Sequence, residues 1–350
     1  MVDTNSTLFR FISCVNCGTT SDNHHRIVQT KVFKKGFLNG ATLSVVVCEK
    51  CGLVFLNPQP MTESIRKFYS SEYYDNTESV ITLKGLISQK TWLRNSLYFW
   101  LVSQLNGITR SSILDIGSGY GLWLHLFDKS NHLVGIELSR QATNIAREFF
   151  ELMVYEIDFL ENEFENAEFD LVTCIAVIEH FPNPLAALVE MNRILKKGGH
   201  LYLHTPDLHA LVLRSGIESY FKLVHLFYFS FSTLSSLLRK AGFEVIVYRQ
   251  HPAIVGKRQV GTLDVLARKQ EECDFEDAQI IPSSCDDLSS VLSSVGLALK
   301  RDRLYIWFLG PLYRKPKLLA LARWLKKVSK LNRTTMRRSE MDSGKTSPLH

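Results

Sequence analysis

Short apolar runs alternate with helical patterns along the middle of the chain, from about residue 111 to residue 269. Such runs predict strands buried on both faces, because a strand covered on both sides is apolar at nearly every position. The expected strands are 112–116, 132–137, 152–157, 169–175, 199–204, 243–250 and 261–268. Helices are expected between them, at 121–129, 140–150, 184–196 and 232–241. The alternation predicts an α/β domain with a seven-stranded, mostly parallel sheet, in which one of the last two strands runs antiparallel.

The rest of the chain separates into four segments by composition. Residues 1–60 hold two cysteine pairs, and residues 61–110 hold two helical patterns that form a cap or linker. The first pattern runs from Thr62, as its N-cap, to Tyr74, and the second from about 83 to 105. Residues 270–331 combine an acidic, serine-rich linker with C-terminal helices, and residues 332–350 have the composition of a disordered basic tail.

A glycine-rich turn follows the first expected strand of the α/β domain, in the order S-I-L-D-I-G-S-G-Y-G over residues 112–121. Glycines at 117, 119 and 121 allow backbone amides to approach a ligand at the start of the expected helix. Glu137 ends the next strand, where a carboxylate can reach ribose hydroxyls. A dinucleotide-binding loop needs glycine at position 122, where this chain has Leu122. Asp115 would repel a pyrophosphate and suits a ligand carrying an ammonium or a sulfonium. A plain structural turn is the alternative.

The D-x-G-x-G-x-G pattern with the later Glu137 resembles motif I of the class I S-adenosylmethionine-dependent methyltransferases. The resemblance implies a Rossmann-like sheet and a cofactor site at its strand ends. The residues assigned to that site are Asp115, Gly117, Ser118, Gly119, Gly121, Glu137, Leu138, Asp158, Phe159 and Ile175. Asp158 follows the third strand and is expected to accept a hydrogen bond from the adenine amine, with Phe159 and Leu138 packing on the ring. As an alternative, an aspartate after a strand is a common turn residue.

Two C-x-x-C-G knuckles in the first segment predict a metal site. Cys14, Cys17, Cys48 and Cys51 can place four thiolates at the corners of a tetrahedron, which is typical of structural zinc. The alternative is a disulfide framework, which an intracellular chain disfavours. His24 and His25 lie between the knuckles and could replace a ligand, but we expect them to be solvated loop residues.

The exit of the fourth strand carries the candidate catalytic residues. Glu179-His180-Phe181-Pro182-Asn183-Pro184 resembles the E-H-x-x-D-P element of small-molecule methyltransferases, including those of ubiquinone biosynthesis, where this loop faces the transferred methyl group. In the ubiquinone enzymes a further carboxylate stands three positions earlier, where this chain has Ala176. His204 and His225 resemble positions that border the acceptor pocket in the same broad family. A histidine can serve as a base for an acceptor that must lose a proton. A purely structural role is the alternative for each of the three histidines.

Charge is distributed unevenly. Residues 301–350 contain 13 Lys or Arg and 3 Asp or Glu, whereas the whole chain carries a net charge of only +6, so residues 1–300 are mildly acidic. This argues against a nucleic-acid groove in the body of the protein. Residues 317–331 combine an apolar stripe with lysines and arginines, which favours either contact with an anionic membrane surface or docking on the protein itself. No run of about 18 apolar residues is present, so we expect a cytoplasmic protein, peripheral at most to the inner face of the membrane.

As far as about residue 268, the chain resembles bacterial methyltransferases that join a two-knuckle zinc module to a class I domain and are associated with sugars of surface polysaccharides or with secondary metabolites. The line V-V-V-C-E-K-C-G-L-V-F-L-N-P-Q-P carries this resemblance. It implies methyl transfer from S-adenosylmethionine to a small-molecule or glycosyl acceptor, at oxygen or carbon, with zinc as a structural metal. Two alternatives remain: an RNA methyltransferase, and a scaffold that binds S-adenosylmethionine without catalysis. The sequence does not indicate the oligomeric state.

Overall fold

The computed structural model describes residues 8–31, 42–73, 83–208, 225–255 and 258–270. All of them belong to one compact unit, Met1–Val295. The predictions for residues 271–350, which include the C-terminal helices, the basic tail and its membrane contact, lie outside the described residues. Within the described residues, no helix is both long enough and apolar enough to cross a bilayer.

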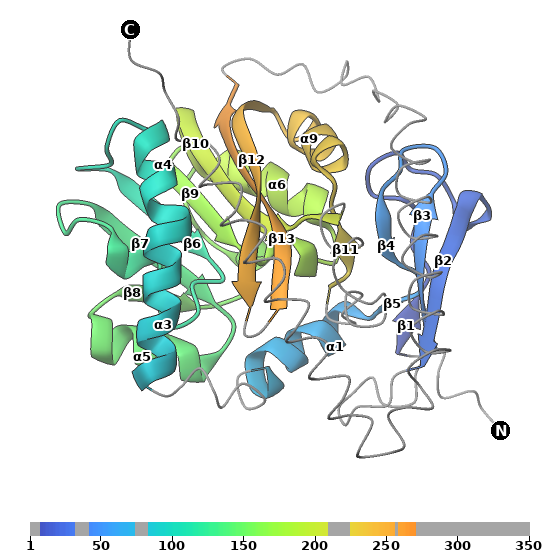
Figure 1. Ribbon diagram of the computed structural model, residues 1–350, viewed down its shortest axis with the longest axis horizontal. Helices are drawn as coiled ribbons and strands as arrows, with labels where there is room; N and C mark the ends of the chain where they lie inside the picture. Colours follow the sequence, from blue (N-terminus) through green and yellow to red (C-terminus); the bar gives the residue numbers. More distant parts are fainter. Residues whose placement is uncertain (1–7, 32–41, 74–82, 209–224, 256–257, 271–350) are drawn as a thin grey trace, which may run out of the picture. The chain divides into compact units, whose positions relative to one another are not determined.

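A seven-stranded mixed sheet forms the centre of the described chain (Figure 1). Its strands are β6 (Ser112–Ile116), β7 (His132–Glu137), β8 (Met153–Glu156), β9 (Phe169–Ile175), β10 (Leu195–Pro206), β12 (Phe243–Val255) and β13 (Arg258–Lys269). They lie in the order β12-β13-β10-β9-β6-β7-β8, and β6 to β10 pair in parallel. β13 is antiparallel to both of its neighbours. The predicted sheet, with one antiparallel strand among the last two, is confirmed.

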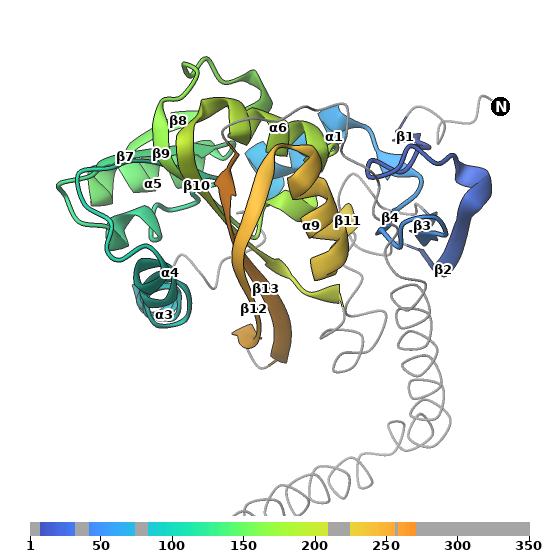
Figure 2. The ribbon, with the colours of Figure 1, turned by 90° about the horizontal axis from the view of Figure 1, so that it is seen from above.

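Helices cover the two faces of this sheet (Figure 2). α3 (Leu83–Leu93), a π-helical segment η3 (Arg94–Tyr98) and α4 (Phe99–Gln104) lie over one face, while α6 (Pro184–Ile194) and α9 (Phe231–Lys240) lie over the other. α5 (Arg140–Phe150) joins β7 to β8. The core on the α3 side is continuous from helix to sheet, because Leu97 and Leu101 belong to the same buried cluster as Trp123 and Tyr202.

Three helix predictions need correction. Only a short 3-10 turn, η4 (Leu124–Leu126), occupies the segment 121–129; residues 120–124 are all buried, and Phe127 is already extended. The helix expected at 184–196 ends at Ile194, and the Lys196–Gly199 stop instead forms the irregular start of β10. Thr62 is the first residue of α1 (Thr62–Lys67), which has Met61 as its cap and continues as a π-helical segment, η2 (Phe68–Glu72).

Two smaller sheets contain the N-terminal strands. β1 (Phe9–Arg10) pairs with β5 (Gln59–Pro60). The second sheet has the order β11-β4-β3-β2 and contains β2 (His24–Lys31), β3 (Thr42–Cys48) and β4 (Val54–Leu56). Its fourth strand, β11 (Phe227–Tyr228), comes from the distant segment between β10 and α9. The N-terminal segment is therefore joined to the later chain by strand pairing.

Candidate functional site

The glycine-rich loop after β6 is held by hydrogen bonds to the neighbouring strand. The amides of Gly117 and Ser118 both donate to the carbonyl oxygen of Ile136, at 2.8 and 3.0 Å. The amide of Gly119 donates to the Glu137 carboxylate at 2.9 Å. No helix begins at this loop, so the expected helix N-terminus is not there. The loop is thus shaped by bonds to β7 before any ligand arrives.

Two of the loop glycines are required by packing as well as by backbone angle. Gly117 has φ +68°, and a Cβ atom there would lie 2.4 Å from a methyl group of Val177. Gly121 has φ +77°, and its Cβ would lie 2.4 Å from a methyl group of Leu152. L-residues rarely adopt either angle. The glycine spacing noted in the sequence therefore lets the loop lie close against the β9 exit and the β8 entry.

Glu137 ends β7 and is nearly buried, with 7% exposure. One carboxylate oxygen accepts the Gly119 amide, and the other accepts the Ser139 amide at 2.9 Å. These bonds fix the carboxylate beside the glycine loop. Each carboxylate oxygen can accept a second hydrogen bond, so the geometry fits a carboxylate that also receives two ribose hydroxyls.

Asp115 is buried beneath the loop. Its carboxylate accepts the Thr173 hydroxyl at 2.7 Å, and that hydroxyl in turn accepts the indole N–H of Trp123 at 3.1 Å. Burial raises the pKa of Asp115 to about 8, and the nearby Glu137 charge adds to the shift, whereas the Thr173 bond opposes it. A cationic ligand over the loop would favour the ionised form. This fits a ligand that carries a sulfonium and an ammonium, as S-adenosylmethionine does.

The predicted adenine side is built on the turn after β8. Asp158 caps η5 (Phe159–Glu161) by accepting the Leu160 amide at 3.0 Å, and it also pairs with Arg66 of α1 at 2.7 Å. Phe159 is buried and Leu138 is half-buried. Asp158 therefore acts as a turn residue, and its bond to adenine stays a prediction.

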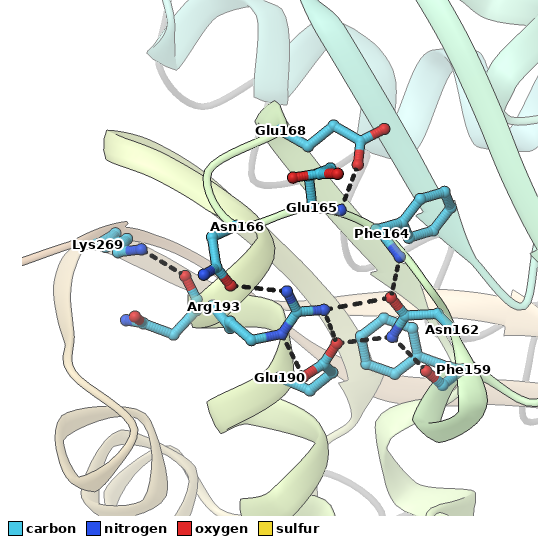
Figure 3. A network of polar contacts seen from close by, with 10 residues as sticks. Phe159, Asn162, Phe164, Glu165, Asn166, Glu168, Glu190, Arg193 and Lys269 are labelled. Atoms are coloured by element: carbon cyan, nitrogen blue, oxygen red, sulfur yellow. Dashed lines mark hydrogen bonds and ion pairs between the residues drawn. The ribbon is translucent and has the colours of Figure 1, made fainter.

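A polar network fastens this turn to α6 (Figure 3). Asn162 donates to the carbonyl oxygen of Phe159 and to the carboxylate of Glu190, both at 2.7 Å. Arg193 binds Glu190 and also reaches Asn166 at 2.8 Å. The turn that carries Phe159 is thus fixed to α6 beside the end of β8.

Three of the four candidate catalytic residues come together after β9. Glu179 and His180 lie on the turn η6 (Ile178–His180), and the rings of His180 and His225 are 4.9 Å apart. The cluster offers three ligand atoms, one each from Glu179, His180 and His225. These atoms all lie within 4.8 Å of one another, so the cluster could hold a metal ion. One Glu179 oxygen accepts the Thr205 hydroxyl at 2.9 Å, and the other is buried with no hydrogen-bond partner among the described residues.

The fourth candidate, His204, bonds in another direction. Its Nδ1 lies 2.5 Å from a carboxylate oxygen of Asp264, whose other oxygen pairs with Arg249 at 2.6 Å. The three residues are register partners on β10, β13 and β12. Ile175, predicted to contact the cofactor, is the register partner of His204 on β9 and is half-buried. His204 thus belongs to a buried ionic row across the sheet, beside the β9 exit.

Tyr69 is a site residue that the sequence did not indicate. Its hydroxyl lies 2.7 Å from Nδ1 of His180, although the two residues are 111 positions apart. Burial raises the pKa of Tyr69 well above its usual range, and the charges of Tyr73, Glu179 and Glu137 add to the effect. The hydroxyl therefore stays protonated. The aromatic positions of the 62–74 pattern were the only signal, and they predicted simple packing equally well.

The four knuckle cysteines gather as predicted. Their sulfur atoms all lie within 4.8 Å of one another, with Cys14 3.4 Å from Cys51 and Cys17 3.4 Å from Cys48. All four are free thiols, so the disulfide alternative is not the arrangement in this structure. Tetrahedral zinc with Zn–S bonds of about 2.3 Å needs sulfurs roughly 3.8 Å apart, and the donor set fits.

The two histidines between the knuckles are not loop residues. Both begin β2. The ring of His24 bonds to the carbonyl oxygen of Thr19 at 3.0 Å through Nε2 and to Asn57 at 3.2 Å through Nδ1. Since both ring nitrogens have protein partners, His24 is a structural residue, and only His25 is exposed as expected.

Comparison with known proteins identifies the domain. A family model described as a methyltransferase domain matches residues 90–248. The ubiquinone biosynthesis O-methyltransferase of Alkalilimnicola ehrlichii is 32% identical over 108 residues, which are 29% of this chain and 44% of that protein. Its counterpart in Vibrio vulnificus is 28% identical over 128 residues, 35% of this chain and 52% of that protein. The chain thus spans about half the length of the curated relatives it matches.

Solved structures of the same class also align with the chain. An S-adenosylmethionine-dependent methyltransferase from Mesorhizobium loti is 14% identical, with a TM-score of 0.43, and the alignment covers 51% of this chain and all of that one. Residues 90–248, which include the glycine loop and Glu137, therefore match a methyltransferase domain.

Proposed function

We propose that the protein transfers a methyl group from S-adenosylmethionine to a hydroxyl or an activated carbon of a small-molecule or glycosyl acceptor. The observation that carries the proposal is the meeting of two groups at one edge of the sheet. The preformed loop with Glu137 follows β6 and β7, and the cluster of Glu179, His180 and His225 lies beyond β9 and β10. Ligands of open α/β sheets bind at this edge. The O-methyltransferase names of the curated relatives support oxygen as the methylated atom.

When bound, the cofactor supplies an electrophilic methyl group on a positively charged sulfur. The residues of the chain then have two tasks, which are to hold the ligands and to move one proton. Glu137 would hold the ribose hydroxyls, and the loop amides that bond to Ile136 and Glu137 keep the loop beside that carboxylate. Because the sulfonium is already a good leaving group, alignment of the reactants would provide most of the rate.

Removal of the acceptor's proton is assigned to His180. In the tautomer whose Nδ1–H donates to the Tyr69 oxygen, Nε2 is the basic nitrogen. Nε2 lies 3.8 Å from the buried Glu179 carboxylate, which stabilises the imidazolium once the proton has moved. The proton passes from the acceptor to Nε2, and the acceptor's electron pair is released for the transfer.

Methyl transfer with labelled cofactor tests this proposal. Purified protein with methyl-tritiated S-adenosylmethionine is offered three acceptor panels: phenolic hydroxy compounds, nucleotide sugars with glycans, and total RNA. Label in the first or second panel supports the proposal. Label in RNA alone supports the RNA alternative. If S-adenosylhomocysteine binds but no panel is labelled, the non-catalytic scaffold is supported.

We further propose that Cys14, Cys17, Cys48 and Cys51 hold one structural zinc ion. The support is the closeness of four free thiols, three of them buried. All four ligand positions come from the protein, which leaves no open position for catalysis. Metal analysis of protein purified without chelators should give about one equivalent of zinc per chain. Full metal retention by Cys51→Ser would contradict the assignment.

A further inference from the structure

The cysteine module and the acceptor side of the site share a strand pair. β4 begins three residues after Cys51 and pairs antiparallel with β11, with Phe55 opposite Phe227 and Val54 opposite Tyr228. His225 lies two residues before β11. We propose that the four-cysteine module is a positioning element that holds His225 and Glu179 in place for the acceptor. The inference rests on the proposed role of this cluster in catalysis.

Backbone hydrogen bonds at the two ends of β4 connect the second knuckle to Glu179. The Gly52 amide donates to the carbonyl oxygen of Cys48, and the Cys48 amide donates to that of Leu53, both at 2.9 Å. At the far end of β4, the Leu56 amide donates to the carbonyl oxygen of Leu226 at 2.9 Å. The Leu226 amide then donates to the carbonyl oxygen of Glu179, also at 2.9 Å. Three backbone hydrogen bonds and the covalent segment from Leu53 to Leu56 thus lead from Cys48 to the turn that carries Glu179.

Packed side chains form a second connection, from the first knuckle. Cys17 contacts the Thr19 hydroxyl at 2.9 Å, and the carbonyl oxygen of Thr19 binds the His24 ring. That ring packs edge-on against Phe55 at 5.0 Å, and Phe55 stacks on Phe227 at 5.9 Å. Both phenylalanines are at most 1% exposed. Such closely packed rings transmit a displacement at one end to the other, because cores have little free volume.

The first knuckle is also fastened to the methyltransferase domain. The Asn16 side chain accepts the Ser236 hydroxyl at 3.0 Å, and its backbone carbonyl accepts the Lys240 ammonium, both from α9. α9 follows β11 directly, after the Ser230 cap. The segment from His225 to Lys240 is therefore held by the module at two places, the strand pair and the helix.

β11 cannot supply this rigidity alone. It contains two residues, and in its sheet its strand neighbour among the described residues is β4. Strand pairs this short are stable only through the structure that flanks them. The cofactor side is anchored elsewhere, because the loop amides bond to Ile136 and Glu137. Loss of the module's order should therefore loosen the acceptor side and leave cofactor binding in place.

Hydrogen exchange on the full-length protein tests the inference, with zinc removed by a high-affinity chelator. Exchange should rise by about tenfold or more in peptides covering 225–228 and 178–181, and stay unchanged in peptides covering 112–119. The dissociation constant of S-adenosylhomocysteine should change by less than about twofold. Unchanged protection at 225–228 would overturn the inference. An equal loss of protection at 112–119 would also overturn it, since the metal would then support the whole fold.

Two variants separate positioning from metal binding. Phe55→Ala keeps the four cysteines, so it should retain zinc and still loosen 225–228, whereas Phe55→Leu should restore protection. Cys174→Ala removes a buried thiol outside the knuckles and should retain both zinc and the protection at 225–228. If Phe55→Ala holds zinc with wild-type protection, the packing connection is wrong. Exchange is read without an acceptor, so failure of the proposed methyl transfer would leave this result interpretable.

Discussion

Glu137 offers the sharpest test of the cofactor site, because its carboxylate has a structural and a binding task. Replacement by alanine removes the acceptor of two amide hydrogen bonds, from Gly119 and Ser139. Bonds to a charged group contribute about 1.5 kcal/mol or more each, so the ligand-free protein should lose about 3 kcal/mol of unfolding free energy. For a domain of this size, the loss corresponds to a decrease in Tm of roughly 6–12 °C.

The same substitution should weaken cofactor binding. Loss of the ribose hydrogen bonds costs roughly 1.5–3 kcal/mol, which is about a ten- to hundredfold rise in the dissociation constant. Titration calorimetry with S-adenosylhomocysteine measures the affinity, and scanning calorimetry of the ligand-free protein measures the stability. Glu137→Gln keeps one carbonyl acceptor and should give an intermediate result in both assays.

Glu156 provides the matched control. It is the register partner of Glu137 on β8, but it is exposed, and its ion partner Arg140 lies 4.0 Å away. Glu156→Ala should change stability by less than about 0.5 kcal/mol and leave affinity unchanged. Wild-type affinity in Glu137→Ala would refute the ribose assignment. Wild-type stability in the same variant would refute the reasoning from the two amide bonds.

Other predictions concern the proton balance, the base and the metal. Because burial raises the pKa of Asp115 to about 8, this carboxyl is mostly protonated at pH 7, and binding of the cationic cofactor should release up to one proton there. Cofactor affinity should therefore rise about tenfold per pH unit up to about pH 8. Calorimetry in buffers of different ionisation enthalpy measures the protons released on binding. Asp115→Asn should abolish this proton release. The same raised pKa makes the folded state bind the extra proton, so its contribution to stability should fall as pH rises from about 4 to 8. His180→Ala should lower turnover about a hundredfold with cofactor affinity nearly unchanged, whereas an equal loss of binding would mark a structural residue. Chelation should lower the Tm of the wild type and leave Cys51→Ser, which lacks a ligand, unchanged.

Local pattern was sufficient for the elements whose burial is uniform. The strands expected at 112–116, 132–137 and 169–175 have the observed bounds, because each is a short apolar run covered on both faces. The two ends of α5 also match the predicted 140–150, because its apolar positions recur at helical spacing and Ser139 caps it. The spacing of the glycines predicted the loop, and the spacing of the cysteines predicted the knuckles. Each spacing follows from the backbone conformation of a single turn.

Tertiary structure decided the contacts that bring the site together. The bond between Tyr69 and His180 spans 111 positions, and β11 adds to a sheet that begins about 200 residues earlier. The segment 121–129 has helical spacing, but the structure keeps only a single turn there, with its first four residues buried. His204 looked like a pocket residue by position, yet strand register placed it opposite Asp264. The sequence by itself determined the strands 112–116, 132–137 and 169–175, the helix 140–150 and the two knuckles, because those depend on neighbours in the chain. Which of these elements contact one another depends on how the helices and the N-terminal strands pack against the central sheet. Only the tertiary structure decided that.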